Sequence, residues 1–254
     1  MLEPRELAAR IEAERRLPDG DEERFSGYGV MGVPFRSGHL LCLRRFPAAS
    51  IGKGYTSVWH RSPGGCWTFI QDVPPRNGCT RYFGSAVDRT VESPIHLEWT
   101  GPRSLQVRTE GAMPVEWTFS LARTRSSDLM NRVSNRIPDR MWRSRTLLRA
   151  MSAIGGIALG AGRLNLTGVL PNGQRFMANP KVVWTIDDSR ATVCGEDIGP
   201  TGPLAEQARL GDLWLPQEGR FFAGNAFLEK LDTLRHLTAT SRPDGKRRHC
   251  LVCP

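Results

Sequence analysis

Residues 115–122 read VEWTFSLA, a stretch in which apolar and polar side chains alternate with a period of two. In an extended chain, the apolar side chains of such a stretch fall on one face and the polar ones fall on the other. The alternation therefore indicates a β-strand with one buried face and one face that meets water or lines a pocket. A strand of this kind is typical of an antiparallel sheet.

The same pattern extends outward from this strand. Residues 95–100 read IHLEWT, where three apolar side chains oppose His96, Glu98 and Thr100. Short apolar runs separated by turn residues continue from residue 27 to residue 123, and they return after residue 162. The predicted strands are residues 39–46, 55–61, 67–73, 80–87, 95–100, 104–109, 115–122, 163–170, 174–178, 182–186, 191–194 and 220–228. We predict a mainly β chain that forms a lipocalin-like antiparallel β-barrel or sandwich.

A helical pattern interrupts the strands at about residues 124–160. Apolar residues such as Leu129 and Val133 recur there at helical spacing on a background of arginine, and Pro138 divides the segment into two. Two interpretations of this basic insertion stay open. The helices cover an open end of the barrel, or they rest on an anionic membrane. In the second interpretation the membrane contacts are Arg140, Trp142, Arg143 and Arg145.

The chain is predicted to have one domain with two extensions. Residues 1–26 form an accessory N-terminal helix, residues 27–232 form a single β-rich domain, and residues 233–254 form a basic tail without a fold of its own. Within the domain, residues 203–210 are predicted as a short helix. The net charge of +9 is concentrated in the insertion and the tail, while the first 24 residues are net acidic. This distribution disfavours nucleic acid as a partner.

Two short motifs bear on cofactors and metals. Residues 27–32 read GYGVMG and match a dinucleotide-binding glycine string, but no buried strand precedes them and Pro34 follows where a helix should begin. Cys250 and Cys253 form a C-x-x-C pair, but the chain lacks the second close pair that a closed zinc site needs. We therefore predict no cofactor and no metal.

Cysteine usage and hydropathy indicate the compartment. The six cysteines are scattered, and the N-terminal residues contain no apolar stretch for secretion, so we predict free thiols in the cytoplasm. The longest weakly polar stretch, residues 151–162, has about 12 residues, whereas a transmembrane helix needs about 20 apolar residues. The predicted localisation is cytoplasmic, with peripheral membrane association if the insertion binds lipid.

Polar and aromatic residues within the apolar strands are the candidates for a site. A few polar groups in an apolar pocket orient a substrate, and a histidine beside a carboxylate can move protons near neutral pH. The catalytic candidates are His60, Asp72, Tyr82 and Glu98. The ligand-binding candidates are Trp59, Arg81, Glu196, Asp197, Arg209, Asp212 and Trp214. The competing interpretation for each is a solvent-facing or loop-fixing role.

The order of strands, helical interruption and further strands resembles that of the lipocalin-like (calycin) proteins related to hydroxyneurosporene synthase, the carotenoid hydratases. The resemblance is carried by YTSVWH at residues 55–60 and IHLEW at residues 95–99, and it covers about residues 27–230. It transfers no catalytic residue. It implies apolar ligands such as isoprenoids or polyketides, in secondary metabolism.

Two functions of different classes follow from these patterns. The first is binding of a hydrophobic small molecule with cofactor-independent acid–base chemistry, as in a hydratase, an isomerase or a cyclase. The second is a non-catalytic carrier of a lipid-like ligand at the membrane periphery. A pocket that contains a buried histidine–carboxylate pair would favour the enzyme, and an apolar cavity without proton-transfer groups would favour the carrier.

Overall fold

The structure is a computed structural model in which residues 2–230 are described. Its strands are β1 (Glu23–Pro34), β2 (Leu40–Ala49), β3 (Gly52–Arg61), β4 (Trp67–Gln71), β5 (Arg89–Glu92), β6 (Ile95–Trp99), β7 (Ser104–Thr109), β8 (Val115–Ala122), β9 (Thr167–Val169), β10 (Arg175–Val193), β11 (Glu196–Asp197), β12 (Arg209–Leu210), β13 (Leu213–Trp214) and β14 (Arg220–Leu228). Its helices are α1 (Pro4–Glu14), η1 (Pro75–Asn77), α2 (Thr80–Phe83), η2 (Gly84–Ala86), α3 (Arg125–Arg136), η3 (Asp139–Arg143) and α4 (Arg145–Ala158). The predicted tail at residues 233–254 lies outside the described residues.

Strands from both sides of the helical insertion belong to one sheet. Within residues 2–230 this sheet has twelve strands, and its main path runs β5-β4-β3-β2-β1-β14-β10-β8-β7-β6. The neighbours along the path are antiparallel except β4 and β5, which are parallel. The prediction of a mainly β, antiparallel fold with a basic helical insertion is confirmed.

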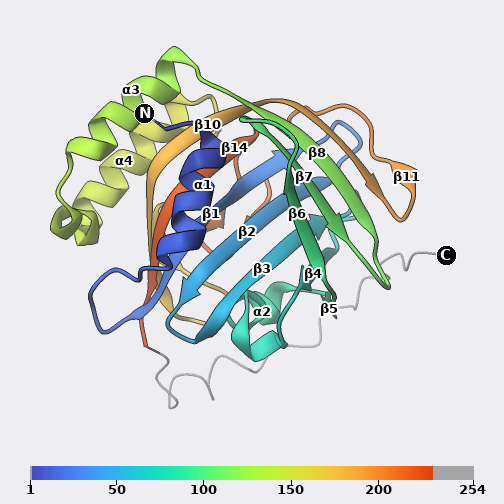
Figure 1. Cartoon of the computed structure of the whole chain (residues 1–254), viewed down its shortest axis with the longest axis horizontal. Coiled ribbons are helices and arrows are strands. Elements are labelled where there is room, and N and C mark those ends of the chain that lie inside the picture. The colour runs from blue at the N-terminus through green and yellow to red at the C-terminus, as the bar shows by residue number, and fades with distance from the viewer. Residues whose placement is uncertain (1, 231–254) are drawn as a thin grey trace.

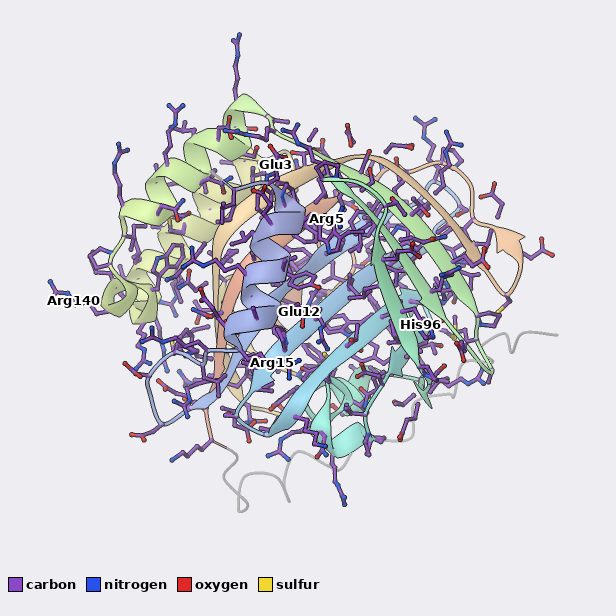
Figure 2. All side chains as sticks on the ribbon, viewed as in Figure 1. Glu3, Arg5, Glu12, Arg15, His96 and Arg140 are labelled. Carbon is purple, nitrogen blue, oxygen red and sulfur yellow. The ribbon has the colours of Figure 1, made fainter. Side chains whose placement is uncertain are left out.

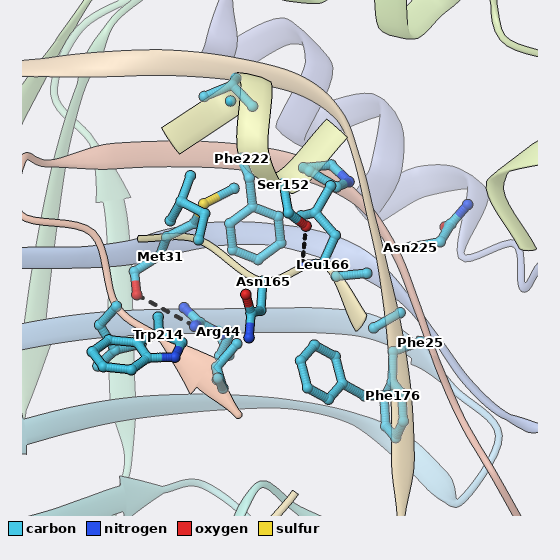
Figure 3. Close-up of a pocket in the computed structure, with 18 of the residues that line it drawn as sticks. Phe25, Met31, Arg44, Ser152, Asn165, Leu166, Phe176, Trp214, Phe222 and Asn225 are labelled. Carbon is cyan, nitrogen blue, oxygen red and sulfur yellow. Dashed lines mark hydrogen bonds between the residues drawn. The ribbon is translucent and has the colours of Figure 1, made fainter. Parts of the chain in front are cut away.

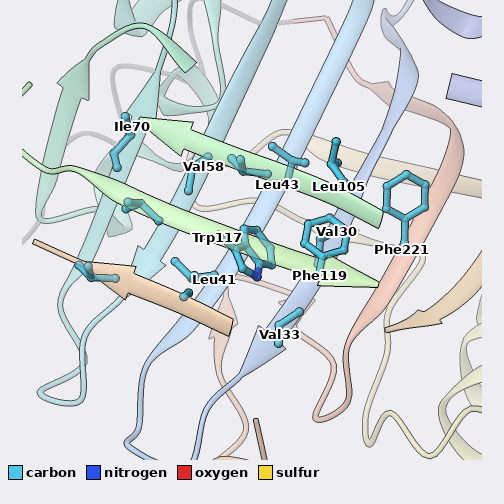
Figure 4. Packing of buried hydrophobic residues seen from close by; sticks show 14 of the residues in the cluster. Val30, Val33, Leu41, Leu43, Val58, Ile70, Leu105, Trp117, Phe119 and Phe221 are labelled. Carbon is cyan, nitrogen blue, oxygen red and sulfur yellow. The ribbon is translucent and has the colours of Figure 1, made fainter. Parts of the chain in front are cut away.

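The sheet curls on itself into a half-barrel, so that β6, β7 and β8 cross over β1 to β4 (Figure 1). An apolar core fills the space between the two halves (Figure 4). Strands β1 to β4 contribute Val30, Leu43, Val58 and Ile70, and β7 and β8 contribute Leu105, Val107, Trp117 and Phe119. This core is the reason for the alternation in the sequence, because β7 and β8 bury only the face that meets β1 to β4.

Helix α1 closes one side of this core. Its Ala8 is buried there, and its Glu12 carboxylate accepts hydrogen bonds from Arg45 at 2.7 Å and from the Tyr28 hydroxyl at 3.0 Å. Burial would raise the pKa of Glu12, but the hydrogen bonds from Arg45 and Tyr28 outweigh burial and lower it. The predicted accessory helix is therefore anchored to the sheet by a charged cluster.

The glycine string at residues 27–32 lies within β1 and serves close strand packing. A Cβ atom at Gly27 would lie 2.0 Å from the carbonyl oxygen of Arg45, and one at Gly29 would lie 2.1 Å from that of Leu43. Strand β1 pairs with β2 on one side and with β14 on the other. The glycines thus permit backbone approach in the middle of a sheet, in agreement with the rejection of a dinucleotide site.

The helical insertion forms α3, η3 and α4, which pack beside β10 (Figure 1). Strand β10 pairs with β9 at residues 175–177 and with β8 at residues 185–193. Between these two pairings, the Asn131 side chain of α3 donates to the Val183 carbonyl at 2.9 Å and accepts from the Val183 N–H at 2.7 Å. One buried amide therefore continues the hydrogen bonding of β10 and fixes α3 to the sheet.

Replacing Asn131 with alanine should lower the free energy of unfolding by about 2 kcal/mol, because the backbone groups of Val183 would lose their partners in a buried place. Urea unfolding of the full chain measures this change. Asn135→Ala is the matched control, since Asn135 is an exposed asparagine of the same helix. Equal stability of the two variants would contradict the anchoring role of Asn131.

The structure corrects three predicted elements. Residues 80–87 form α2 and η2 rather than a strand, because Cys79, Tyr82 and Phe83 reach one apolar cluster at helical spacing. Residues 203–210 form a loop that ends in β12 rather than a helix. The Gln217 side chain bonds the N–H and the carbonyl of Leu204, so the backbone is satisfied without a helix.

The third correction concerns β10. Three strands were predicted between residues 174 and 194, but the chain forms one strand of 19 residues. Its register shifts at Pro180 and again after Ile186, so two bulges absorb the residues that were interpreted as turns. None of the helices within residues 2–230 is long and apolar enough to cross a membrane.

Candidate functional site

A cavity of about 170 Å³ lies on the face of the sheet opposite to α1. Strands β1, β2, β3, β10 and β14 form one wall, and α2, α3, η3 and α4 contribute to the others. Residues 164–166 and 213–215 also reach the cavity. The lining is predominantly apolar and aromatic, with a few polar groups among the rings (Figure 3). Cavities of this composition are the usual binding places for small molecules.

Arg44 is the charged residue in the described lining of this cavity. It follows Leu43 in β2, and because neighbouring side chains of a strand point to opposite faces, Arg45 reaches Glu12 of α1 while Arg44 points into the cavity. Only 8% of Arg44 is exposed. The two arginines therefore have opposite surroundings, one ion-paired beside a helix and the other within an apolar cavity.

The Arg44 guanidinium is held by neutral groups. It donates to the backbone carbonyls of Val30, Leu43 and Met31, the last two at 3.0 and 3.4 Å. Its central carbon lies 4.5 Å from the Trp59 ring centroid and 5.4 Å from that of Phe222. Among the described residues, no carboxylate forms an ion pair with it. Carbonyl dipoles and ring faces stabilise a cation but do not neutralise its charge.

Trp142 of η3 supplies a second polar group in the lining. Its side chain is 1% exposed, and its indole N–H has no hydrogen-bond acceptor among the described residues. A buried donor without a partner costs about 1–3 kcal/mol. Trp142 thus brings a donor without a described partner to the cavity lining.

The other polar groups of the lining mainly hold the walls together. Ser152 of α4 donates to the Leu148 carbonyl at 2.7 Å and accepts from the Leu166 N–H at 2.8 Å (Figure 3). Asn165 donates to the backbone carbonyl of Asp212 at 3.0 Å. These bonds fix residues 164–166 over the cavity, which positions its outer wall.

Two tyrosines and a thiol of the lining are paired within the protein. The Tyr55 hydroxyl lies 3.4 Å from the Cys79 sulfur, and Tyr82 donates to Glu23 at 2.6 Å. Burial is the largest cause that raises the pKa of Tyr55, Cys79 and Tyr82. All three therefore stay protonated at neutral pH and offer no base there.

The four predicted catalytic residues do not lie in one site. Tyr82 lines the cavity, but His60 lies on the other face of β3, because its strand neighbour Trp59 points into the cavity. Asp72 is exposed and accepts from the Thr56 N–H at 2.7 Å. Glu98 is exposed on β6, 3.4 Å from Arg108. The structure thus assembles no histidine–carboxylate pair from this set.

The buried His60 instead pairs with the half-buried His39. The His39 Nδ1 and His60 Nε2 atoms are 2.7 Å apart, and the two rings stack with centroids 5.0 Å apart. Burial, with His39 as a further cause, lowers the pKa of His60 to about 3. Burial also lowers the pKa of His39. Both imidazoles are therefore neutral at physiological pH.

The predicted ligand-binding residues divide into two groups. Trp59 and Trp214 line the cavity. Arg81 pairs with Glu23 at 2.6 Å, Arg209 lies over the Trp214 ring at 5.3 Å, and Asp212 accepts from the Val169 N–H at 2.9 Å. Glu196 and Asp197 are exposed in β11, at the far end of β10 from α3 and α4 (Figure 1). The first group touches the cavity, and the second supports its walls or faces solvent.

The predicted membrane-contact residues also divide. Arg140, Arg143 and Arg145 are exposed, and Arg140 projects away from the body of the protein (Figure 2). Trp142 is buried against Leu148 and lines the cavity. A buried ring cannot reach a bilayer, so Trp142 has to be reassigned from the membrane contacts to the cavity lining.

The cysteines differ from the prediction of free thiols. Cys42 and Cys79 are free and buried, but Cys66 and Cys194 take part in disulfide bonds. Cys250 and Cys253 lie outside the described residues. Within residues 2–230, no three side chains of histidine, cysteine, aspartate or glutamate gather closely enough to hold a metal ion.

Comparisons with known proteins found little similarity. No family model matches the sequence, and no curated protein matches it. Among solved structures, the crystal structure of acetoacetate decarboxylase from Legionella pneumophila is similar, with 12% sequence identity and a TM-score of 0.35. The match covers 86% of this chain and 90% of that chain. Similarity this low does not support a functional proposal, which therefore has to rest on the cavity. The resemblance to carotenoid hydratases stays a prediction.

Proposed function

We propose that this protein binds a small hydrophobic molecule that carries a carboxylate, with the apolar part in the cavity and the carboxylate on Arg44. The observation that carries the proposal is the burial of Arg44 in an apolar lining without a carboxylate partner. A buried charge without a counterion is costly, and a ligand carboxylate would supply the counterion. The planar guanidinium also matches a carboxylate in geometry.

The size of the cavity limits the buried part of the ligand. An engineered protein cavity of about 150 Å³ holds one benzene molecule. The cavity of about 170 Å³ in this protein therefore suits a single ring or a short branched chain. A short isoprenoid or polyketide acid meets this limit, whereas a full carotenoid would need the walls to move apart.

The lining supports binding rather than acid–base chemistry. Its described residues include no histidine, lysine, aspartate or glutamate, and its tyrosines and thiol have raised pKa values. The predicted acid–base enzyme needs a proton-transfer group beside the ligand. Because His60, Asp72 and Glu98 lie elsewhere, we favour the non-catalytic carrier among the two predicted functions.

Phenylacetate should bind more tightly than phenylacetamide, its neutral isostere, because only the acid offers a charge to Arg44. Calorimetric titration of the full chain measures both affinities. Arg44→Met should weaken phenylacetate binding by about tenfold to a hundredfold, the usual contribution of hydrogen bonds to charged groups. The same variant should leave phenylacetamide binding nearly unchanged.

The neighbouring arginine provides the matched control. Arg45→Met removes the same charge one residue away, but on the face that meets α1. It should preserve the preference for the acid. Equal affinity of the wild type for the two probes, or an Arg44→Met variant that keeps the preference, would refute the proposal.

A further inference from the structure

The exposed large apolar side chains of this protein are concentrated on its helical insertion. Of the seven such residues in the described part of the chain, five lie between residues 129 and 157. They are Leu129, Val133, Met141, Ile154 and Ile157. Ile157 is 86% exposed, and Ile154, three residues earlier on α4, is 56% exposed. Apolar residues scattered singly need no explanation, whereas five on one insertion, over α3, η3 and α4, point to an interaction surface.

The same helices are strongly basic. Between Arg125 and Ala158, the span of these helices, the sequence contains seven arginines against two aspartates. On α3 and α4, Arg132, Arg136 and Arg149 are exposed, and none of them forms an ion pair with a described residue. Arg132 and Arg136 alternate with Leu129 and Val133 along the outer side of α3. Positive charge and apolar surface therefore occur together.

Both helices carry apolar residues on their exposed side as well as on the side that meets the cavity. Their inner side contributes Met130, Met151 and Gly155 to the cavity lining, although the buried residues of α3 are polar, and their exposed residues include Leu129, Val133, Ile154 and Ile157. A helix that only covers a core needs an apolar stripe on its inner side alone. The outer apolar residues are thus not explained by the packing of α3 and α4 on the sheet.

We propose that the outer side of α3 and α4 docks on an anionic lipid surface. The headgroups of such a surface attract guanidinium groups, and its acyl region takes up isoleucine and leucine. The phosphates of a nucleic acid would bind the arginines, but they would make no favourable contact with the exposed apolar side chains. The surface consists of Leu129, Arg132, Val133, Arg136, Arg149, Ile154 and Ile157, and it excludes the buried Trp142.

Sedimentation with vesicles tests the proposal on the full chain. The wild type should bind vesicles of equal parts phosphatidylcholine and phosphatidylglycerol, and it should not bind vesicles of phosphatidylcholine alone. Salt should weaken the binding, because it screens exposed charges. Each basic residue near such a surface strengthens binding by about fivefold, so changing Arg132, Arg136 and Arg149 together to Gln should weaken it on the order of a hundredfold.

The apolar contribution is tested separately. Changing Ile154 and Ile157 together to Ser should weaken vesicle binding by roughly tenfold or more at low salt, because the charge is unchanged and only apolar burial is lost. Val169→Ser is the matched control, since Val169 is a 40% exposed apolar residue outside the insertion. Changing Arg36, Arg76 and Arg89 together to Gln removes the same charge elsewhere and should preserve most of the binding.

Thermal unfolding midpoints equal to that of the wild type show that the variants are folded, and the single Ile157→Ser variant replaces the double one if the latter unfolds. Absent binding to both vesicle types, or equal binding to both, would overturn the proposal. Salt-sensitive binding to duplex DNA without binding to vesicles would also overturn it. The proposal would be overturned as well if the arginine and isoleucine variants of the insertion bound vesicles as well as the two control variants.

Discussion

Trp117→Ala should lower the free energy of unfolding by about 3–5 kcal/mol, the usual range for removing a large buried side chain. Trp117 is fully buried on β8, between the two halves of the curled sheet (Figure 4). Its indole N–H donates to the Ser189 hydroxyl of β10 at 2.9 Å. The substitution removes both the packing between the halves and the partner of a buried hydroxyl.

Urea unfolding of the full chain measures this loss. Trp99→Ala is the matched control, because Trp99 belongs to β6, two strands away from β8 in the sheet, and is only partly buried against the same core. We expect a clearly smaller loss for the control. A loss below about 1 kcal/mol for Trp117→Ala would contradict the arrangement in which β6 to β8 pack over β1 to β4.

Acidification from about pH 7 to pH 5 should lower the free energy of unfolding by about 2 kcal/mol through His60 alone. An unfolded histidine binds a proton near pH 6.5, whereas the pKa of His60 is lowered to about 3 in the folded protein. Between pH 6.5 and pH 3 the unfolded chain therefore binds more protons than the folded protein does. Stability is therefore complete above about pH 6.5 and is lost as the pH falls towards 3.

Measurements above pH 5 separate the loss of stability caused by His60 from the loss caused by protonation of carboxylates. A glutamate with a lowered pKa, such as Glu12, contributes stability that is lost only as the pH falls below the ordinary glutamate pKa of 4.5. His60→Gln should flatten the dependence of the urea midpoint on pH between about 7 and 5. His96→Gln, which removes an exposed imidazole, is the matched control. A His60→Gln variant with the wild-type slope would contradict the assignment.

The strands that the sequence predicted best are those with one wet face. Residues 104–109 and 115–122 were predicted with the bounds that β7 and β8 have in the structure. Strands β1 to β3 are covered on both faces, by the core on one side and by the cavity on the other. Because both faces are covered, apolar residues do not alternate with polar ones along these strands, and no pattern in the sequence assigns a residue to a face.

This ambiguity explains which candidate site residues were misplaced. Trp59 and His60 are neighbours in β3 and were predicted for one site, yet one lines the cavity and the other lies in the opposite face. Nothing in the local sequence distinguishes the two faces, because both are buried. The aromatic candidates reached the cavity more often than the acidic ones, since acidic side chains on these elements remain in solvent.

Arg44 was missed although the sequence contains a signal for it. Residues 40–46 read LLCLRRF, and two adjacent arginines in a buried strand cannot share a face. One of them therefore has to enter the interior. The pairing of Arg45 with Glu12 depends on the docking of α1, a contact between distant parts of the chain that no local pattern reveals.

Strand β10 belongs to two regions at once, because Val183 lines the cavity while Ala191 lies in the core under β8. Substitutions that reshape the cavity along β10 therefore act on a strand that also carries part of the core. Residues 164–166 and 213–215 touch the cavity from outside the main path of the sheet. Among related proteins, ligand preference should diverge first in these two segments, while β10 changes slowly.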